Sequence, residues 1–148
     1  MSNWKRRRLE NYDYSTNGLY FITICCYKKE NYFWETDKRE CDTIKLTKAG
    51  EITKAELESI SDKYQNARID NYVIMPNHVH FIIELSGADC SLSTIVNQTK
   101  GKISRILGYS LWQRSFHDHI IRGENDYEMI WNYIETNPSK WDEDRYFL

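Results

Sequence analysis

The segment Met75–Leu85 constrains the fold more than any other part of the chain. It carries two histidines, His78 and His80, in a run of strand-forming residues. In an extended strand, side chains two positions apart point to the same face, so the two imidazoles lie together while Val79 and Phe81 point into a core. Two neutral imidazoles at a fixed separation can hold a divalent metal ion. Histidines in a strand can also be structural hydrogen-bonding residues, and the spacing alone leaves both interpretations open.

Size and composition indicate a single globular domain that covers residues 1–148. The chain has 148 residues, of which 41% are hydrophobic, enough to build a core. No apolar run approaches the roughly 20 residues that a membrane helix needs, and no apolar region of the signal-peptide kind follows the basic N-terminus. The four cysteines contain no Cys-x-x-Cys pair, which argues against a zinc ribbon or a disulfide framework. We therefore expect a cytoplasmic protein that contacts no membrane.

The order of strand and helix patterns predicts an α+β fold. Strands are expected at Leu19–Tyr27, Arg68–Met75, His78–Leu85 and Ser115–Arg122, and helices at Thr47–Tyr64, Ser91–Leu107 and Glu124–Thr136. This is the order of a ferredoxin-like (split βαβ) sandwich, an antiparallel sheet with helices packed on one face. The last helix is an addition to that arrangement.

Two polar residues in the last helix could complete a reactive site. Tyr133 and Asn137 are four positions apart, so they share a helix face. A tyrosine hydroxyl can attack a phosphodiester, but with a pKa near ~10 it needs help at neutral pH. A divalent ion held by His78, His80 and the Asn137 amide oxygen could bind and polarise the phosphate. Tyr133 could equally be an aromatic residue at the edge of the core.

Four pieces of the chain, in this order and spacing, resemble the Y1 single-strand transposases of the IS200/IS605 type, and most of all the REP-associated tyrosine transposases. The pieces are Tyr20–Cys25, Met75–His80, Leu111–Arg122 and Tyr133–Pro138. The resemblance implies an HUH endonuclease with a C-terminal catalytic helix, in which His78 and His80 hold Mg²⁺ or Mn²⁺ and Tyr133 is the nucleophile. Asn137, one helical turn later, completes the metal site, although insertion-sequence members often carry glutamine there.

The same resemblance implies an activity and a partner. Members of the family cleave single-stranded DNA near a hairpin, leave a 5′-phosphotyrosine and a free 3′-hydroxyl, and rejoin strands by the reverse reaction. They occur as monomers and as homodimers that exchange the catalytic helix. By analogy, phosphate contacts are expected from the basic residues Arg6, Arg7, Arg8, Lys100, Lys102 and Arg105. Trp112 could stack on an unpaired base or pack in the core, and the arginine cluster could be a solvated tail.

Two alternatives remain open at this stage. His117 and His119 form a second pair on one face of a strand, but no tyrosine follows them at a suitable place, so structural hydrogen bonding or support of the first pair is favoured. The chain could also be a domesticated relative that binds hairpins without cutting them. A histidine-triad phosphoryl enzyme is disfavoured, because Ile82 stands where a third histidine is needed.

Overall fold

The computed structural model describes residues 18–35, 44–87 and 90–138. The strands are β1 (Gly18–Cys25), β2 (Ala67–Ile74), β3 (His78–Leu85) and β4 (His117–Ile120). The helices are the short 3₁₀ turn η1 (Tyr27–Lys29), α2 (Lys48–Glu58), α3 (Ile60–Lys63), α4 (Leu92–Leu107) and α5 (Glu124–Thr136). No helix in these described ranges is long and apolar enough to cross a membrane.

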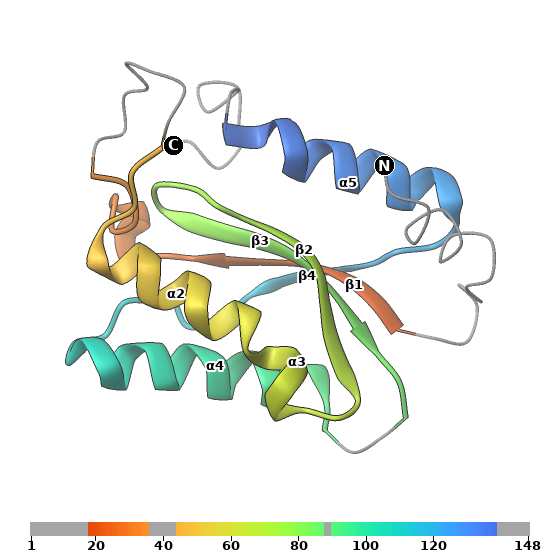
Figure 1. The fold of residues 1–148 in the computed structure, drawn as a ribbon, viewed down its shortest axis with the longest axis horizontal. Coiled ribbons are helices and arrows are strands. Elements are labelled where there is room, and N and C mark those ends of the chain that lie inside the picture. The colour runs from red at the N-terminus through yellow and green to blue at the C-terminus, as the bar shows by residue number, and fades with distance from the viewer. Residues whose placement is uncertain (1–17, 36–43, 88–89, 139–148) are drawn as a thin grey trace.

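The strands form one antiparallel sheet in the order β2-β3-β1-β4. This is the predicted ferredoxin-like arrangement. Helices α2, α3 and α4 lie on one side of the sheet, and α5 crosses the other side (Figure 1). The sheet is therefore a middle layer between two helical layers, which explains why β1 and β3 are apolar along almost their whole length.

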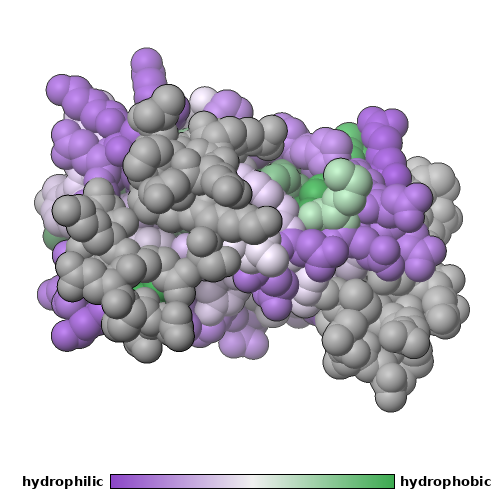
Figure 2. All heavy atoms as spheres, turned by 90° about the horizontal axis from the view of Figure 1, so that it is seen from above, coloured by the Kyte–Doolittle hydropathy of each residue, from purple (hydrophilic) through white to green (hydrophobic). Residues whose placement is uncertain are grey.

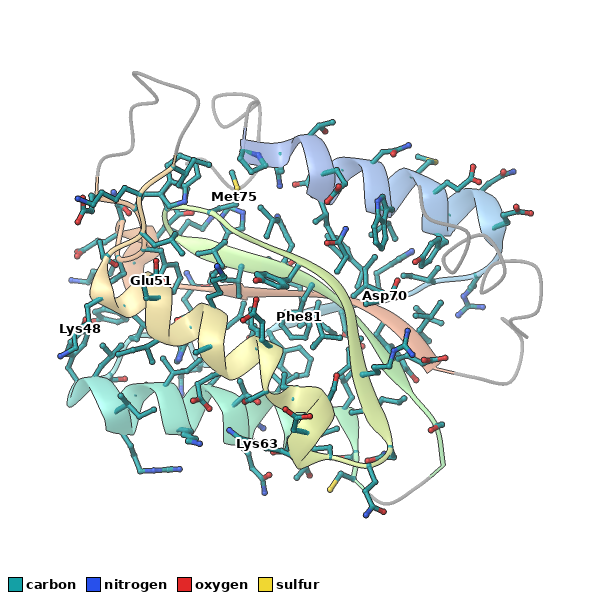
Figure 3. The ribbon with its side chains drawn as sticks, viewed as in Figure 1. Lys48, Glu51, Lys63, Asp70, Met75 and Phe81 are labelled. Carbon is teal, nitrogen blue, oxygen red and sulfur yellow. The ribbon has the colours of Figure 1, made fainter. Side chains whose placement is uncertain are left out.

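Alternating residues of the central strands supply two separate cores. On one face, Ile22 of β1 and Phe81 of β3 pack with the buried residues of α2, α3 and α4; Phe81 lies between the sheet and these helices in Figure 3. On the other face, Phe21 of β1 and Ile82 of β3 pack against α5. The even-numbered residues of β3 thus face α5, and this places His78 and His80 on that side.

Helix boundaries follow their local capping signals. The Thr47 hydroxyl caps α2 by accepting from the Gly50 amide at 3.0 Å, and α4 stops at Gly108 in the left-handed region, with φ 85°. The predicted helix Thr47–Tyr64 is interrupted, because Ser59 separates α2 from α3 with ψ near −6°. The predicted fourth strand, Ser115–Arg122, is also too long, since β4 covers only its middle, His117–Ile120.

Two side-chain contacts attach α5 to the edge strand β2. Near the start of the helix, the buried Tyr127 hydroxyl donates to the Asp70 carboxylate, and Asp70 lies on the α5 side of the sheet (Figure 3). Near its end, the Asn71 amide donates to Glu135 at 3.3 Å. The register of β2 with β3 shifts between Ile69 and Asn71, and Asp70 lies within this break, so the irregular strand presents successive side chains to the helix.

Candidate active site

His78 and His80 lie together at the beginning of β3, under the C-terminal half of α5. Their Nε2 atoms are 3.1 Å apart, and their rings meet edge to face. Both imidazoles are fully buried. Two nitrogen lone pairs at this separation repel each other unless a proton or a cation lies between them. The pair therefore needs either a shared proton or a bound cation between the two nitrogens.

The Asn77 side chain sets the tautomer of His78. Its amide nitrogen donates to the Lys29 carbonyl at 3.0 Å, so the other end of the amide must be the oxygen. That oxygen lies 2.6 Å from His78 Nδ1 and can only accept, which places the proton on Nδ1. The lone pair of His78 is then on Nε2, the atom that faces His80.

Thr23 and Phe21 of β1 hold His80. The Thr23 hydroxyl is 2.8 Å from His80 Nδ1, and Phe21 stacks on the imidazole with ring centroids 5.2 Å apart. Thr23 lies opposite His80 in the strand register. As an acceptor from Nδ1–H, this hydroxyl leaves the lone pair of His80 on Nε2 as well. Thr23 and Asn77 contact the histidines, and the motif does not reveal these contacts; for Thr23 the only signal was a polar residue inside an apolar strand.

Tyr133 reaches the histidines from α5 of the same chain. Its hydroxyl is 3.5 Å from His80 Nε2, and its ring meets both His80 and Phe21 edge to face. At 3.5 Å the hydroxyl is in contact with the imidazole but makes a weak hydrogen bond at best. Tyr133 is half-buried, whereas the imidazoles beneath it are closed to solvent.

Asn137 follows Tyr133 by one helical turn and stays on the same helix face. The helix α5 ends at Thr136 as predicted, but Asn137 keeps helical angles of φ −59° and ψ −44°, although the position before a proline disfavours them. Its side chain is buried, and its Nδ2 atom has no hydrogen-bond partner. A buried amide with an unsatisfied end is costly unless something binds there.

The residues present fit a divalent ion. Two nitrogens bound to one ion at about 2.1 Å and at a right angle lie about 3 Å apart, close to the 3.1 Å between the two Nε2 atoms. In the described ranges no group of three or more His, Cys, Asp and Glu side chains could hold a metal ion. A third ligand from the described residues would therefore be of another type, such as the amide oxygen of the buried Asn137.

The structure corrects the expectation for Lys100. Instead of facing solvent, Lys100 is buried, and its ammonium donates to the carbonyls of Gln113, Arg114 and Ser115 at 2.9, 3.4 and 3.3 Å. Burial lowers the pKa of Lys100 below its usual value. The lysine satisfies carbonyls of the segment before β4, so its position is structural.

The other candidate DNA contacts have mixed placements. Trp112 is buried, donates to the Lys100 carbonyl at 3.2 Å and packs against Phe33. Of the two roles expected for Trp112, it therefore has the one in the core. Lys102 is partly exposed and pairs with Glu56 at 3.4 Å, and Arg105 is exposed. Both belong to α4, on the side of the sheet away from the histidines (Figure 1). The predictions for Arg6, Arg7 and Arg8 lie outside the described residues.

The second histidine pair has the same orientation as the first. His117 and His119 pair with Thr23 and Phe21, so both face the α5 side, and both are exposed. His119 Nε2 is 2.8 Å from Asp126 of α5, whose carboxylate also accepts from the Arg122 amide. His119 therefore has the structural hydrogen bond that was favoured for this pair.

The chain is similar to known transposases in sequence and in fold. Residues 16–137 match the family model described as "Transposase IS200 like". An uncharacterised protein of Haemophilus influenzae is 33% identical, with 95% of this chain and 91% of that protein aligned. The Escherichia coli REP-associated tyrosine transposase is 33% identical over 49% of this chain and 44% of its own length. A solved REP-associated tyrosine transposase bound to a REP hairpin shares the fold, with a TM-score of 0.64 and 24% identity over 83% of this chain and 67% of that one. The chain belongs to the family of IS200-like transposases, and its relatives include the REP-associated tyrosine transposases.

Proposed function

We propose that this transposase cleaves and rejoins single-stranded DNA through a covalent bond to Tyr133. His78, His80 and Asn137 would hold the divalent ion, Mg²⁺ or Mn²⁺. One observation carries the proposal: the Tyr133 hydroxyl lies 3.5 Å from His80 Nε2, although the two residues are 53 positions apart. A phenol beside two imidazoles arranged for a cation is the arrangement that phosphoryl transfer to tyrosine requires.

The reaction exchanges one phosphodiester for another. Tyr133 Oη attacks the phosphorus, the bond to the 3′-oxygen breaks, and that oxygen takes up a proton to become a free 3′-hydroxyl. The phenol proton leaves to solvent, and the DNA end stays attached as a 5′-phosphotyrosine. Attack by a 3′-hydroxyl on this bond reverses the step and rejoins a strand without an external energy source.

The protein side chains have separate tasks. Asn77, and Thr23 when its hydroxyl accepts from His80 Nδ1, would keep the histidine lone pairs on Nε2, and Phe21 stacks on the His80 ring. When bound, a divalent ion would polarise the phosphate and stabilise its developing charge. His80 Nε2 has a single lone pair, so it cannot hold an ion and also remove the phenol proton. Because both imidazoles are buried, the groups that cover them must move aside for a phosphate to reach them.

The proposed substrate is a single strand that contains a hairpin. The solved relative bound to a REP hairpin supports this choice of DNA. The tyrosine lies beside both histidines within the chain, and the proposed site can form in a monomer or, with α5 exchanged, in a homodimer.

A trapping experiment tests the proposal. The protein is incubated with a pool of hairpin-bearing single strands and Mn²⁺, and denaturing gels and mass spectrometry then detect a nucleotide adduct on Tyr133. Tyr133→Phe should form no adduct, whereas Tyr64→Phe, on the opposite face of the sheet, should form as much as the native chain. An adduct on the Tyr133→Phe variant would remove Tyr133 from its role. Tight hairpin binding with no cleavage by the native chain would favour the domesticated, non-catalytic alternative.

A further inference from the structure

The segment from Tyr27 to Tyr32, which follows β1, is attached directly to the residues that precede His78. The Asn77 carbonyl accepts from the Cys26 amide at 2.8 Å, and the Pro76 carbonyl accepts from the Tyr32 amide at 3.0 Å. The Asn77 side chain donates to Lys29 in the same segment. The surface formed by this segment therefore adjoins the histidine pair, at the end of the sheet where α4 and α5 also end (Figure 1).

Two consecutive lysines in this segment have a strained backbone. Lys28 and Lys29 have φ values of 56° and 54°, and they are the only non-glycine residues with positive φ in the part of the chain that the structure describes. Side chains with a Cβ rarely adopt this region, and such strain concentrates at functional sites. Both side chains are exposed. The turn thus presents two positive charges beside the site.

Aromatic rings flank the lysine turn. Tyr27 is 52% exposed, and the Lys28 ammonium lies over its ring at 5.4 Å from the centroid. Tyr109, just after α4, is 46% exposed and stacks on Tyr32 with centroids 6.3 Å apart. The Tyr27 amide donates to the Leu111 carbonyl at 2.8 Å, which brings the two stretches side by side. Two tyrosine rings are thus held in place but remain open to solvent.

We propose that Tyr27, Lys28, Lys29 and Tyr109, called here the tyrosine–lysine surface, bind the single-stranded DNA that adjoins the scissile phosphate. The proposal rests on the proposed function, because it takes the histidine pair as the place of that phosphate. Unpaired bases stack on exposed aromatic rings, and lysines follow the phosphates between them. Glu30 is the one acidic residue between Tyr27 and Tyr32, so the turn keeps a positive balance.

The chemistry of the surface favours a single strand over the paired stem of a hairpin. In a duplex the base faces are already stacked on one another and cannot cover a tyrosine ring. The face of the molecule seen from above in Figure 2, the α5 side, is mostly hydrophilic in the described residues and shows only small hydrophobic areas. The tyrosine–lysine surface instead combines open rings with lysines next to the site.

Binding measurements in the Tyr133→Phe background separate this proposal from the chemistry. Fluorescence anisotropy compares a hairpin alone with the same hairpin carrying a single-stranded extension on its 5′ or 3′ side. Tyr27→Ala and Tyr109→Ala should each weaken binding of one extended DNA by about tenfold and leave the affinity for the bare hairpin unchanged. Two control variants should keep the native affinity for all of these DNAs: Tyr27→Phe, which keeps the ring, and Met129→Ala, an exposed change on α5. Thermal melting verifies that every variant is folded.

An extension with abasic sites provides the second arm. It should bind the native surface as weakly as the normal extension binds Tyr27→Ala, because the stacking partner is missing. Equal affinity of the alanine variants and the parent for both extended DNAs would overturn the proposal, and so would an equal loss for the bare hairpin. If the native chain forms no adduct but these differences appear, the proposed function fails while the single-strand site stands.

Discussion

Asn77 and His78 are neighbours in sequence, and the side chain of the first fixes the proton position of the second. The amide of Asn77 is itself oriented by the Lys29 carbonyl, and its oxygen accepts from His78 Nδ1 at 2.6 Å. One side chain therefore joins the strained lysine turn to the histidine pair. A residue that looks like an ordinary turn former in sequence becomes a positioning residue in the fold.

Asn77→Ala should weaken metal binding. Without the acceptor, His78 can rotate or place its proton on Nε2, so we expect the affinity for Mn²⁺ to fall by about 10- to 100-fold. Isothermal titration calorimetry measures the change without any DNA reaction. Asn77→Asp keeps an acceptor for Nδ1–H and should retain more affinity than the alanine variant. Native Mn²⁺ affinity in Asn77→Ala would show that the hydrogen bond does not position the imidazole.

Lys28→Gly should stabilise the protein while weakening its hold on single-stranded DNA. Glycine accepts a φ of 56° without strain, so the free energy of unfolding should rise by about 1 kcal/mol. Lys54→Gly, an exposed change within α2, should lower it by about 1 kcal/mol. Urea denaturation measures both. Stabilisation with unchanged affinity for extended DNA would mean that the strained turn has no part in binding.

Two helical glycines should respond oppositely to the same substitution. A Cβ on Gly50 would lie 2.6 Å from the Phe33 carbonyl oxygen, a backbone atom that cannot easily move. We expect Gly50→Ala to cost about 1–3 kcal/mol of unfolding free energy. A Cβ on Gly101 would meet only the Arg105 side chain at 3.5 Å, so Gly101→Ala should add about 0.5–1 kcal/mol. Chemical denaturation measures the free energy of unfolding of the two variants, and an equal change in both would contradict the packing around Gly50.

Replacing Lys100 should destabilise the protein more than replacing Lys102, because the first is buried and the second lies at the surface. Lys100→Met removes the donor shared by three backbone carbonyls and should lower the unfolding free energy by about 1–3 kcal/mol. Lys102→Met loses only a surface pair with Glu56 and should change it by less than about 1 kcal/mol. Thermal and urea unfolding measure the difference. A Lys100→Met variant with native stability but poor DNA binding would reinstate Lys100 as a DNA contact.

Local pattern was enough to predict most of the fold. The alternation in β3 placed both histidines on one face, and the four-residue spacing in α5 placed Tyr133 and Asn137 on one helix face. These relationships follow from the geometry of a single strand or helix, so a sequence determines them wherever the element packs. The ends of α4 were predicted for the same reason, because Ser91 and Gly108 act on their own helix.

The tertiary structure decided what no single element contains. It placed α5 across the face that carries the histidines, which brought the Tyr133 hydroxyl to 3.5 Å from His80. It also gave Lys100 its partners: this lysine lies on the buried stripe of α4, four positions after Val96 and three before Ile103, and the segment before β4 brought carbonyls to its ammonium. Both outcomes depend on packing and hydrogen bonds between residues distant in the chain, and the pattern within one element carries no information about such contacts.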